Sequence, residues 1–309
     1  MIRSIYEAAR IGVGTIVLSL NTVVHGLPLL AVALIKAVVP LPGFRTFCTR
    51  LLTRIAERWI AFNSAMFDRY TNTRLVIEQM PELDPQGQYL VICNHQSWVD
   101  IPVLQKVFNR RIPLLRFFLK NQLIWVPLLG VIWWALDFPF MKRYSKQMLA
   151  KRPELAGRDI ETTRKACAKF RDMPVAVMNF VEGTRFSAEK RAAQGSPFAQ
   201  LLKPRAGGIA FVIDAMGESI DRMLDVTISY GGPAPSLPDL FANRVREIRV
   251  SVREVAPLHS PKAGAYENDP VHRARFREWI NELWSEKDDR LTRMLARGPG
   301  RATAAAEDR

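Results

Sequence analysis

A short apolar run that ends in a polar turn constrains the fold of this chain most. Residues 89–93 are apolar, and they are followed at once by Asn94, His95, Asp100 and Pro102. A run this short and rich in branched residues is typical of a buried strand. Proline is favoured in the first turn of a helix, so we expect a helix to begin near Asp100. This order of elements predicts an α/β fold whose chemistry lies at the carboxyl edge of a sheet.

His95 and Asp100 are the residue types of a general base and the carboxylate that orients it. An unperturbed imidazole has a pKa of about 6.5, so it can accept a proton at neutral pH. Asp100 can accept the Nδ1 hydrogen and stabilise the imidazolium that forms. Alternatively, residues 97–100 are only the serine-x-x-acid pattern of a helix start, with Asp100 as a cap. This stretch alone leaves both interpretations open.

A second apolar run, at residues 175–180, also ends in a polar turn. The turn consists of Val181, Glu182, Gly183, Thr184 and Arg185. Glycine lets the backbone turn tightly, and the planar guanidinium of arginine is suited to phosphate. The second turn therefore indicates a site for a phosphorylated substrate.

The two turns together resemble a known enzyme family. Asn-His-x-x-x-x-Asp at residues 94–100, followed by Phe-x-Glu-Gly-Thr-Arg at residues 180–185, is similar to the glycerolipid acyltransferases of the 1-acylglycerol-3-phosphate acyltransferase type. Two further blocks fit the family, at residues 120–130 and 138–143. Residues 201–208 resemble the branch that includes lysocardiolipin-type enzymes and long bacterial relatives. The order and spacing of four blocks are more specific than either motif alone.

Three positions depart from the family pattern. The usual proline before Glu182 is Val181, and the acid of the family's Asp-Arg pair is Lys142. A late apolar strand with a Val-Pro step is not evident in residues 208–216. The first two departures leave the catalytic pair and the phosphate ligands in place, and the third concerns the acceptor side of the pocket.

The resemblance implies an enzyme that transfers a fatty acyl group from acyl-CoA or acyl carrier protein to the sn-2 hydroxyl of 1-acylglycerol 3-phosphate. His95 would be the general base and Asp100 would orient it. Arg185 and Arg143 would bind the acceptor phosphate, Asn94 and backbone amides would hold the oxyanion, and Glu182 would fix the loop or orient the glycerol. The implied substrate-binding set is Asn94, Arg143, Glu182, Gly183, Thr184 and Arg185. No metal or other cofactor is implied, and another lysophospholipid of the lysocardiolipin type is the alternative acceptor.

The N-terminal region contains a long apolar stretch. Residues 11–24 and 27–39 carry Lys36 as their only formal charge, with a polar join at residues 21–28. Each half, at about 15 residues, is too short to cross a bilayer core of about 30 Å, while both together are long enough. The stretch is therefore one kinked span or two half-depth helices in a hairpin, and basic residues on both sides favour the hairpin. A buried helical hairpin of a soluble protein is the alternative.

The net charge of +14 predicts an anionic partner. The two turns favour membrane lipids and a phosphorylated acceptor over nucleic acid, and a non-enzymatic basic membrane-tethered binding protein is the alternative. Three cysteines without metal-ligand spacing indicate a reduced compartment. We expect a bacterial inner membrane protein whose site faces the cytoplasm, in an oligomeric state that the sequence leaves open.

The expected fold is a mostly parallel sheet flanked by helices, preceded by the membrane-embedded helical hairpin or kinked span. The expected parts are membrane-anchoring helices (1–68), an acyltransferase domain (69–297) and a disordered tail (298–309). Several local features are predicted as well: an amphipathic helix at 47–66, strands at 112–119, at 224–230 with one face buried and at 247–255 on a sheet edge, a linking helix at 157–172, a mobile loop at 187–200 and a last helix from Asp269. The segment at 123–136 is too short to span a membrane, so it belongs to the core or forms a rim that dips into lipid near the mouth of the pocket, and its aromatic residues favour the core.

Overall fold

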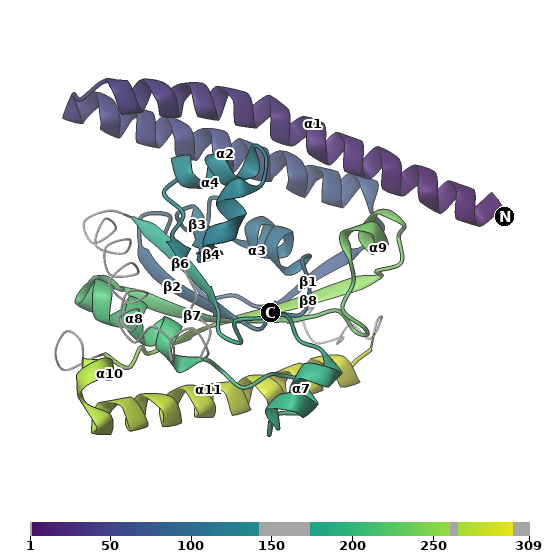
Figure 1. Ribbon diagram of the computed structural model, residues 1–309. Coiled ribbons are helices and arrows are strands. Elements are labelled where there is room, and N and C mark those ends of the chain that lie inside the picture. The colour runs from purple at the N-terminus through teal and green to yellow at the C-terminus, as the bar shows by residue number, and fades with distance from the viewer. Residues whose placement is uncertain (1, 142–173, 260–264, 299–309) are drawn as a thin grey trace, which may run out of the picture.

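The computed structural model describes residues 2–141, 174–259 and 265–298, and a six-stranded sheet lies at its centre (Figure 1). The strand order is β1-β8-β7-β2-β6-β3. Neighbouring strands pair in parallel except β7 and β8, so the prediction of a mostly parallel sheet is confirmed. The strands are β1 (Arg74–Gln79), β2 (Gln88–Cys93), β3 (Leu115–Phe117), β6 (Val175–Phe180), β7 (Arg222–Ser229) and β8 (Glu247–Val255).

Helices cover both faces of this sheet. On one face lie α1 (Ile2–Val38), α2 (Pro42–Tyr70), α3 (Asp100–Phe108) and α4 (Leu129–Ala135). On the other face lie α8 (Ala206–Met216), α10 (Ala265–Asn268) and α11 (Pro270–Ala296). Successive residues of β2 alternate between the two cores, with Tyr89 and Val91 in one and Leu90 and Ile92 in the other. A strand buried on both faces must be apolar throughout, which explains the run that the sequence shows.

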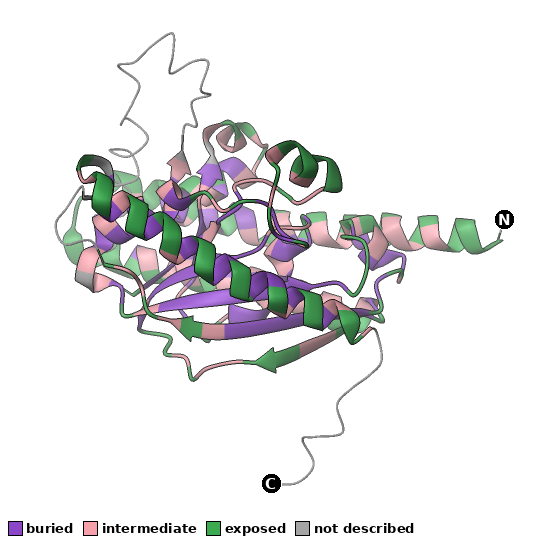
Figure 2. Cartoon of the chain, turned by 90° about the horizontal axis from the view of Figure 1, so that it is seen from below, coloured by how far each residue is buried: buried purple, intermediate pink, exposed green. Residues whose placement is uncertain are grey.

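The two late strands differ from their predictions. Residues 224–230 were predicted to bury one face, but β7 is buried on both faces because helices cover both sides of the sheet. Residues 247–255 were predicted to form an edge, but β8 lies between β1 and β7. The exposed edge is β1, the pink and green strand at the lower border of the sheet in Figure 2.

The predicted strand at residues 112–119 is divided between two sheets. Only β3 joins the central sheet, while β4 (Leu119–Lys120) pairs with β5 (Phe140–Met141) in a separate two-stranded sheet. A 3₁₀ helix, η1 (Asn121–Trp125), follows β4, and a second one, η3 (Gly217–Ser219), precedes β7.

The N-terminal stretch is a single continuous helix, so the prediction of a re-entrant turn at residues 21–28 is wrong. The side chain of Asn21 faces α2, where its Nδ2 donates to Oδ1 of Asn63 at 2.7 Å. Gly26 lies against α4, since a Cβ at this position would be 2.8 Å from Cδ1 of Ile132. The polar and small residues at this point therefore serve helix packing rather than a change of chain direction.

A helical hairpin does form, but from α1 and α2, which run side by side across one face of the molecule (Figure 1). Helix α1 is long and apolar enough to cross a membrane, and only 17% of its most apolar window is buried. This exposure contradicts the alternative of a hairpin buried inside a soluble protein. Exposed apolar side chains on α1 include Val24, Leu27 and Leu34.

For the segment at residues 123–136 a place in the core was favoured over a rim in contact with lipid, and the core prediction is wrong for two of its tryptophans. Ile132 and Ala135 are buried, but Trp125 is 83% exposed and Trp134 is 57% exposed. Trp134 belongs to α4, which packs on α1, and Trp125 belongs to η1, which contacts α4. They therefore add to the exposed apolar surface beside α1.

Three remaining segments have different outcomes. The loop predicted at residues 187–200 contains a helix, α7 (Ala188–Gln194), which Ser187 caps by accepting a hydrogen bond from the amide of Lys190. Helix α11 begins as predicted, because the carboxylate of Asp269 accepts hydrogen bonds from the first amides. The predicted helix at residues 157–172 lies outside the described residues.

Candidate active site

Three neighbouring parallel strands end at one edge of the sheet. Strand β2 leads to Asn94 and His95, β6 leads to Glu182 and β7 leads to Tyr230. In the register of the sheet, Cys93 at the end of β2 lies opposite Phe180 of β6 and Val226 of β7. Because the carboxyl ends of parallel strands meet at the same edge, the two turns that the sequence singles out lie together.

His95 and Asp100 are in direct contact. Nδ1 of His95 lies 2.8 Å from Oδ2 of Asp100, whose side chain is fully buried. The same oxygen accepts hydrogen bonds from the amides of Gln96 and Ser97, at 2.7 and 2.9 Å. The two interpretations of this motif are therefore compatible, since one carboxylate binds the backbone before α3 and also the imidazole.

The contact with Asp100 determines which nitrogen of His95 is free. With the Nδ1 hydrogen directed at the carboxylate, Nε2 becomes the acceptor nitrogen. Among the described residues, Nε2 has no hydrogen-bond partner. The ring stacks on Phe180 with a centroid distance of 3.9 Å and an angle of 14°, which limits its rotation. Nε2 can therefore accept a proton from a substrate.

Glu182 connects the two turns. Its side chain is fully buried, and Oε1 accepts a hydrogen bond from the amide of His95 at 2.8 Å. Oε2 accepts from the amide of Leu202 at 2.9 Å. Burial raises the pKa of Glu182 to about 8, although both amide hydrogen bonds act in the opposite direction. Gly183 follows with φ 69°, a conformation that favours glycine. The geometry supports the first predicted role of Glu182, which is to fix the loop.

Arg185 lies beside the turn that carries His95. Its guanidinium carbon is 4.8 Å from the ring centroid of Trp98, within the range of a cation–π contact. Nζ of Lys190 donates hydrogen bonds to Oγ1 of Thr184 and to the carbonyl oxygen of Arg185. The guanidinium is thus held at the sheet edge in an exposed position. Arg143, the second predicted phosphate ligand, lies outside the described residues.

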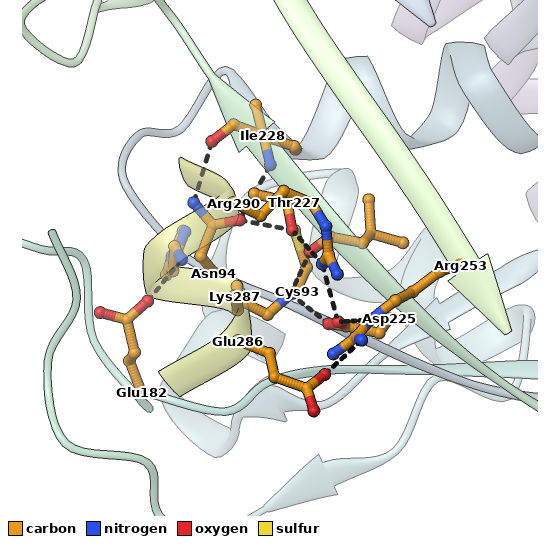
Figure 3. A network of polar contacts seen from close by, with 12 residues as sticks. Cys93, Asn94, Glu182, Asp225, Thr227, Ile228, Arg253, Glu286, Lys287 and Arg290 are labelled. Carbon is orange, nitrogen blue, oxygen red and sulfur yellow. Dashed lines mark hydrogen bonds and ion pairs between the residues drawn. The ribbon is translucent and has the colours of Figure 1, made fainter. Parts of the chain in front are cut away.

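Asn94 was expected to contact the oxyanion, and its position assigns it to another role. It is fully buried, with Nδ2 donating to the carbonyl oxygen of Ile228 and Oδ1 accepting from the amide of the same residue (Figure 3). Its side chain thereby extends the pairing of β2 with β7. The amides of Gln96, Ser97 and Val99 also have acceptors within the turn. The expected oxyanion donors are thus already engaged.

A buried ionic network supports the site from below. Asp225 of β7 forms ion pairs with Lys287 and Arg290 of α11 and with Arg253 of β8 (Figure 3). Burial alone would raise the pKa of Asp225, but the charges of Lys287 and Arg253 lower it overall. This network was not predictable from local sequence patterns, because its members come from three separate elements.

Tyr230 is the second feature that the sequence analysis missed. Its hydroxyl donates a hydrogen bond to Oδ1 of Asp100, and both side chains are buried. The sequence shows only an alternating strand ending at this tyrosine.

Among the described residues, no group of three or more His, Cys, Asp or Glu side chains could hold a metal ion.

An apolar cavity of about 320 Å³ lies next to the motif. It is bounded by α2, α3 and the segment around α4, and its lining includes Trp59, Phe67, Trp98, Ile101, Phe117 and Trp133. Trp98 belongs to this lining and also contacts Arg185. The site therefore combines a base, a cation and an apolar cavity.

The sequence is similar to known acyltransferases. The sequence model of the Acyltransferase family matches residues 74–231, just over half of the chain. The 1-acyl-sn-glycerol-3-phosphate acyltransferase gamma of Homo sapiens is 27% identical over 180 residues, which cover 55% of this chain and 43% of that protein. Lysocardiolipin acyltransferase 1 of Danio rerio is 26% identical over 268 residues, which cover 82% of this chain and 64% of that protein. The chain thus spans less than two thirds of either relative.

One solved structure has the same fold. The crystal structure of the 1-acyl-sn-glycerophosphate (LPA) acyltransferase, PlsC, from Thermotoga maritima superposes with a TM-score of 0.54. The superposition covers 94% of this chain and 98% of that chain at 15% identity. At this identity the likeness concerns the fold alone.

Proposed function

Because the chain belongs to the Acyltransferase family, we propose that it is an O-acyltransferase that moves a fatty acyl group from a thioester to the free hydroxyl of a lysophospholipid. One observation carries the proposal: an imidazole paired with a buried carboxylate lies at the same sheet edge as an exposed guanidinium. A non-enzymatic lipid-binding protein would not need the oriented base.

The proposed reaction uses His95 as a general base. Nε2 removes the proton from the acceptor hydroxyl, and the oxygen attacks the thioester carbonyl carbon to give a tetrahedral intermediate. Collapse of the intermediate breaks the carbon–sulfur bond, and the departing thiolate takes the proton from the imidazolium. Asp100 stabilises the imidazolium between the two steps. No covalent acyl-enzyme is required.

The proposed acceptor is 1-acylglycerol 3-phosphate, with its phosphate on Arg185. An exposed guanidinium can bind phosphate through two parallel hydrogen bonds. The name of the Homo sapiens relative supports this acceptor. The match to the lysocardiolipin acyltransferase covers more of this chain, so a larger lysophospholipid is the second candidate. Acyl-CoA and acyl carrier protein are both retained as donors, with the apolar cavity beside Trp98 as the place for an acyl chain.

We also propose that α1 and α2 attach the protein to a membrane, with the site at the bilayer surface. The support is the exposed apolar surface of α1 together with Trp125 and Trp134. Tryptophan is enriched at the boundary between lipid and water. The cytoplasmic face of a bacterial inner membrane remains our proposal for the location, based on basic residues at both ends of the apolar stretch.

A substrate panel tests the function. Membranes containing the protein are incubated with lysophosphatidate, monolysocardiolipin or lysophosphatidylcholine, each with acyl-CoA and with acyl carrier protein as donor. We expect acylation of lysophosphatidate to exceed that of the zwitterionic lysolipid, which lacks a terminal phosphate. A preference for monolysocardiolipin would select the second candidate acceptor. Failure to acylate any of the three lipids, with either donor, would contradict the proposed function.

A further inference from the structure

We propose that Tyr230 is a positioning residue for the pair formed by His95 and Asp100. Its hydroxyl donates a hydrogen bond to Oδ1 of Asp100, and this bond keeps Oδ2 directed at the imidazole of His95. This inference rests on the proposed function, because it assigns a role within the proposed reaction.

The hydrogen bonds of Asp100 are divided between its two oxygens. Oδ2 accepts from Nδ1 of His95 and from the amides of Gln96 and Ser97. Oδ1 accepts from the hydroxyl of Tyr230, its only hydrogen-bond donor among the described residues. Since Asp100 is fully buried, loss of this hydroxyl would leave Oδ1 without a partner and without water.

The fold brings Tyr230 to this position from a third strand. Tyr230 follows β7 directly, and the side chain of Asn94 binds both backbone groups of Ile228 near the end of that strand. Gly231 comes next with φ 68°, so the chain turns away immediately afterwards. The end of β7 is therefore fixed beside β2, with the phenol directed at Asp100.

The electrostatic surroundings keep Tyr230 a donor. Burial and the charge of Asp100 raise the pKa of Tyr230 well above its ordinary value, so the phenol stays protonated at working pH. Burial likewise raises the pKa of the Cys93 thiol on β2. Among the described residues, the other charged or titratable groups around the pair include Glu182, whose pKa burial raises to about 8, Arg185 on Trp98, and the ion pair between Asp225 of β7 and Lys287 of α11.

The hydrogen bond also has an effect on proton affinity. The hydrogen bond from Tyr230 to Asp100 stabilises the form of the pair in which Asp100 is ionised and His95 is neutral. Removal of this donor makes protonation of the pair easier, whichever of the two residues takes the proton. Easier protonation leaves less free base at a given pH, so the acidic limb of the rate profile moves to higher pH.

The first test compares Tyr230→Phe with Tyr89→Phe. Tyr89 is also buried, and its hydroxyl accepts a hydrogen bond from the amide of Asp84, away from His95. For Tyr230→Phe we expect kcat to fall about tenfold, as for loss of one hydrogen bond to a charged group. KM should change little, and the acidic limb of kcat should shift upward. Tyr89→Phe should keep the profile of the unsubstituted protein.

Two results would overturn the inference. The first is an unchanged pH profile in Tyr230→Phe, whatever happens to kcat, because a purely structural role would lower kcat without moving the limb. The second is that the effects of Tyr230→Phe and Asp100→Asn on kcat add up in the double variant. If Tyr230 acts through Asp100, Tyr230→Phe has no further effect on kcat in the Asp100→Asn background.

A measurement without turnover separates this inference from the proposed function. The chain has 4 histidines, so the NMR signals of the His95 ring can be assigned by comparison with His95→Ala. At a fixed pH, Tyr230→Phe should shift these signals even if no lysolipid is acylated, because the carboxylate that contacts Nδ1 loses a hydrogen bond. Unchanged ring signals of His95 would overturn the positioning role, whereas an inactive unsubstituted protein would overturn only the proposed function.

Discussion

At the scale of single residues, the partner of the Arg185 guanidinium within the described part of the chain is an aromatic ring and not a carboxylate. A cation–π contact uses the flat face of the guanidinium, whereas its N–H groups point outward in the plane of the cation. The contact with Trp98 therefore leaves these N–H groups open for hydrogen bonds to a substrate. A carboxylate partner would compete with a substrate phosphate. The contact therefore places a positive charge beside His95 without neutralising it.

We expect Arg185→Ala to weaken binding of a phosphorylated acceptor. Loss of a charge-assisted hydrogen bond of about 1.5–3 kcal/mol corresponds to a rise in KM of about tenfold to a hundredfold, with a smaller effect on kcat. Steady-state kinetics with lysophosphatidate measures both constants. Arg222→Ala is a matched control, because Arg222 is the first residue of β7 and therefore lies at the end of this strand away from the site. An unchanged KM in Arg185→Ala would exclude the phosphate contact.

Glu182 predicts a pH dependence of stability. Its pKa rises from 4.5 to about 8 on folding because of burial. A raised pKa means that the contribution of this group is fully present below about pH 4.5 and is lost as pH rises through about 8. The free energy of unfolding of the unsubstituted protein should therefore fall between pH 5 and 8 relative to Glu182→Gln. Urea unfolding at several pH values measures this difference, and identical pH dependences in both proteins would contradict the assignment.

Single residues also show which parts of the site can be predicted from the sequence. The positions of His95, Asp100, Glu182 and Arg185 near one edge were predictable, because each follows an apolar run that reads as a parallel strand. The contact of Tyr230 with Asp100 was not, since it joins residues 130 positions apart and depends on β7 lying next to β2. Strand order is a property of the whole sheet, which local patterns do not contain.

At the scale of elements, α1 docks on the domain through glycines. A Cβ on Gly14 would lie 2.7 Å from Cγ of Phe241, which belongs to α9 (Leu237–Phe241). A rigid ring cannot yield as the end of a flexible side chain does. Gly12, half a turn away on the same helix, has no atom within 4 Å of such a Cβ.

We therefore expect Gly14→Leu and Gly12→Leu to differ. Both substitutions improve helix propensity to the same extent. Only Gly14→Leu should separate α1 from α9, and it should show a lower unfolding temperature and faster proteolysis of α1 than the unsubstituted protein. Equal behaviour of the two variants would mean that α1 does not pack on α9 in solution.

The element that sequence patterns misplaced most clearly is β8. Its alternation of polar and apolar residues is typical of a strand with one face in water. The polar residues Glu247, Arg249 and Ser251 are in fact buried. Nε of Arg249 donates to Oε1 of Glu247 at 2.6 Å, and its Nη1 donates to Glu78 of β1. Paired charges inside a sheet produce the same pattern as solvent exposure, so periodicity cannot distinguish the two.

At the scale of the whole molecule, the two faces of the sheet have different surfaces. The side of the sheet that α1 and α2 cover exposes many large apolar side chains. Helix α11 on the opposite side is exposed along one face (Figure 2), and the residues of that face are mainly polar. An exposed apolar surface of this extent indicates contact with another phase or protein. The basic net charge of +14 would strengthen binding to anionic lipid.

Vesicle binding tests this asymmetry. Val24, Leu27 and Leu34 are 62%, 59% and 68% exposed, so replacing them with Asn should leave the folded structure intact. If they insert into lipid, each replacement loses about 1.5–3 kcal/mol and lowers partition into anionic vesicles about tenfold or more. Val271→Asn on α11, at 77% exposure, is the control on the opposite face. Unchanged partition of the triple variant would show that α1 does not enter the bilayer.

The central claim is that the imidazole of His95 accepts the proton of the acceptor hydroxyl. The most direct measurement is the rate of acyl transfer to lysophosphatidate by the unsubstituted protein, His95→Ala and His259→Ala, with folding checked by circular dichroism. His259 is exposed and makes none of the contacts that hold His95 at the sheet edge. We predict that His95→Ala lowers the rate about 10²–10⁴-fold while His259→Ala does not. A correctly folded His95→Ala protein with near-normal turnover would contradict the claim.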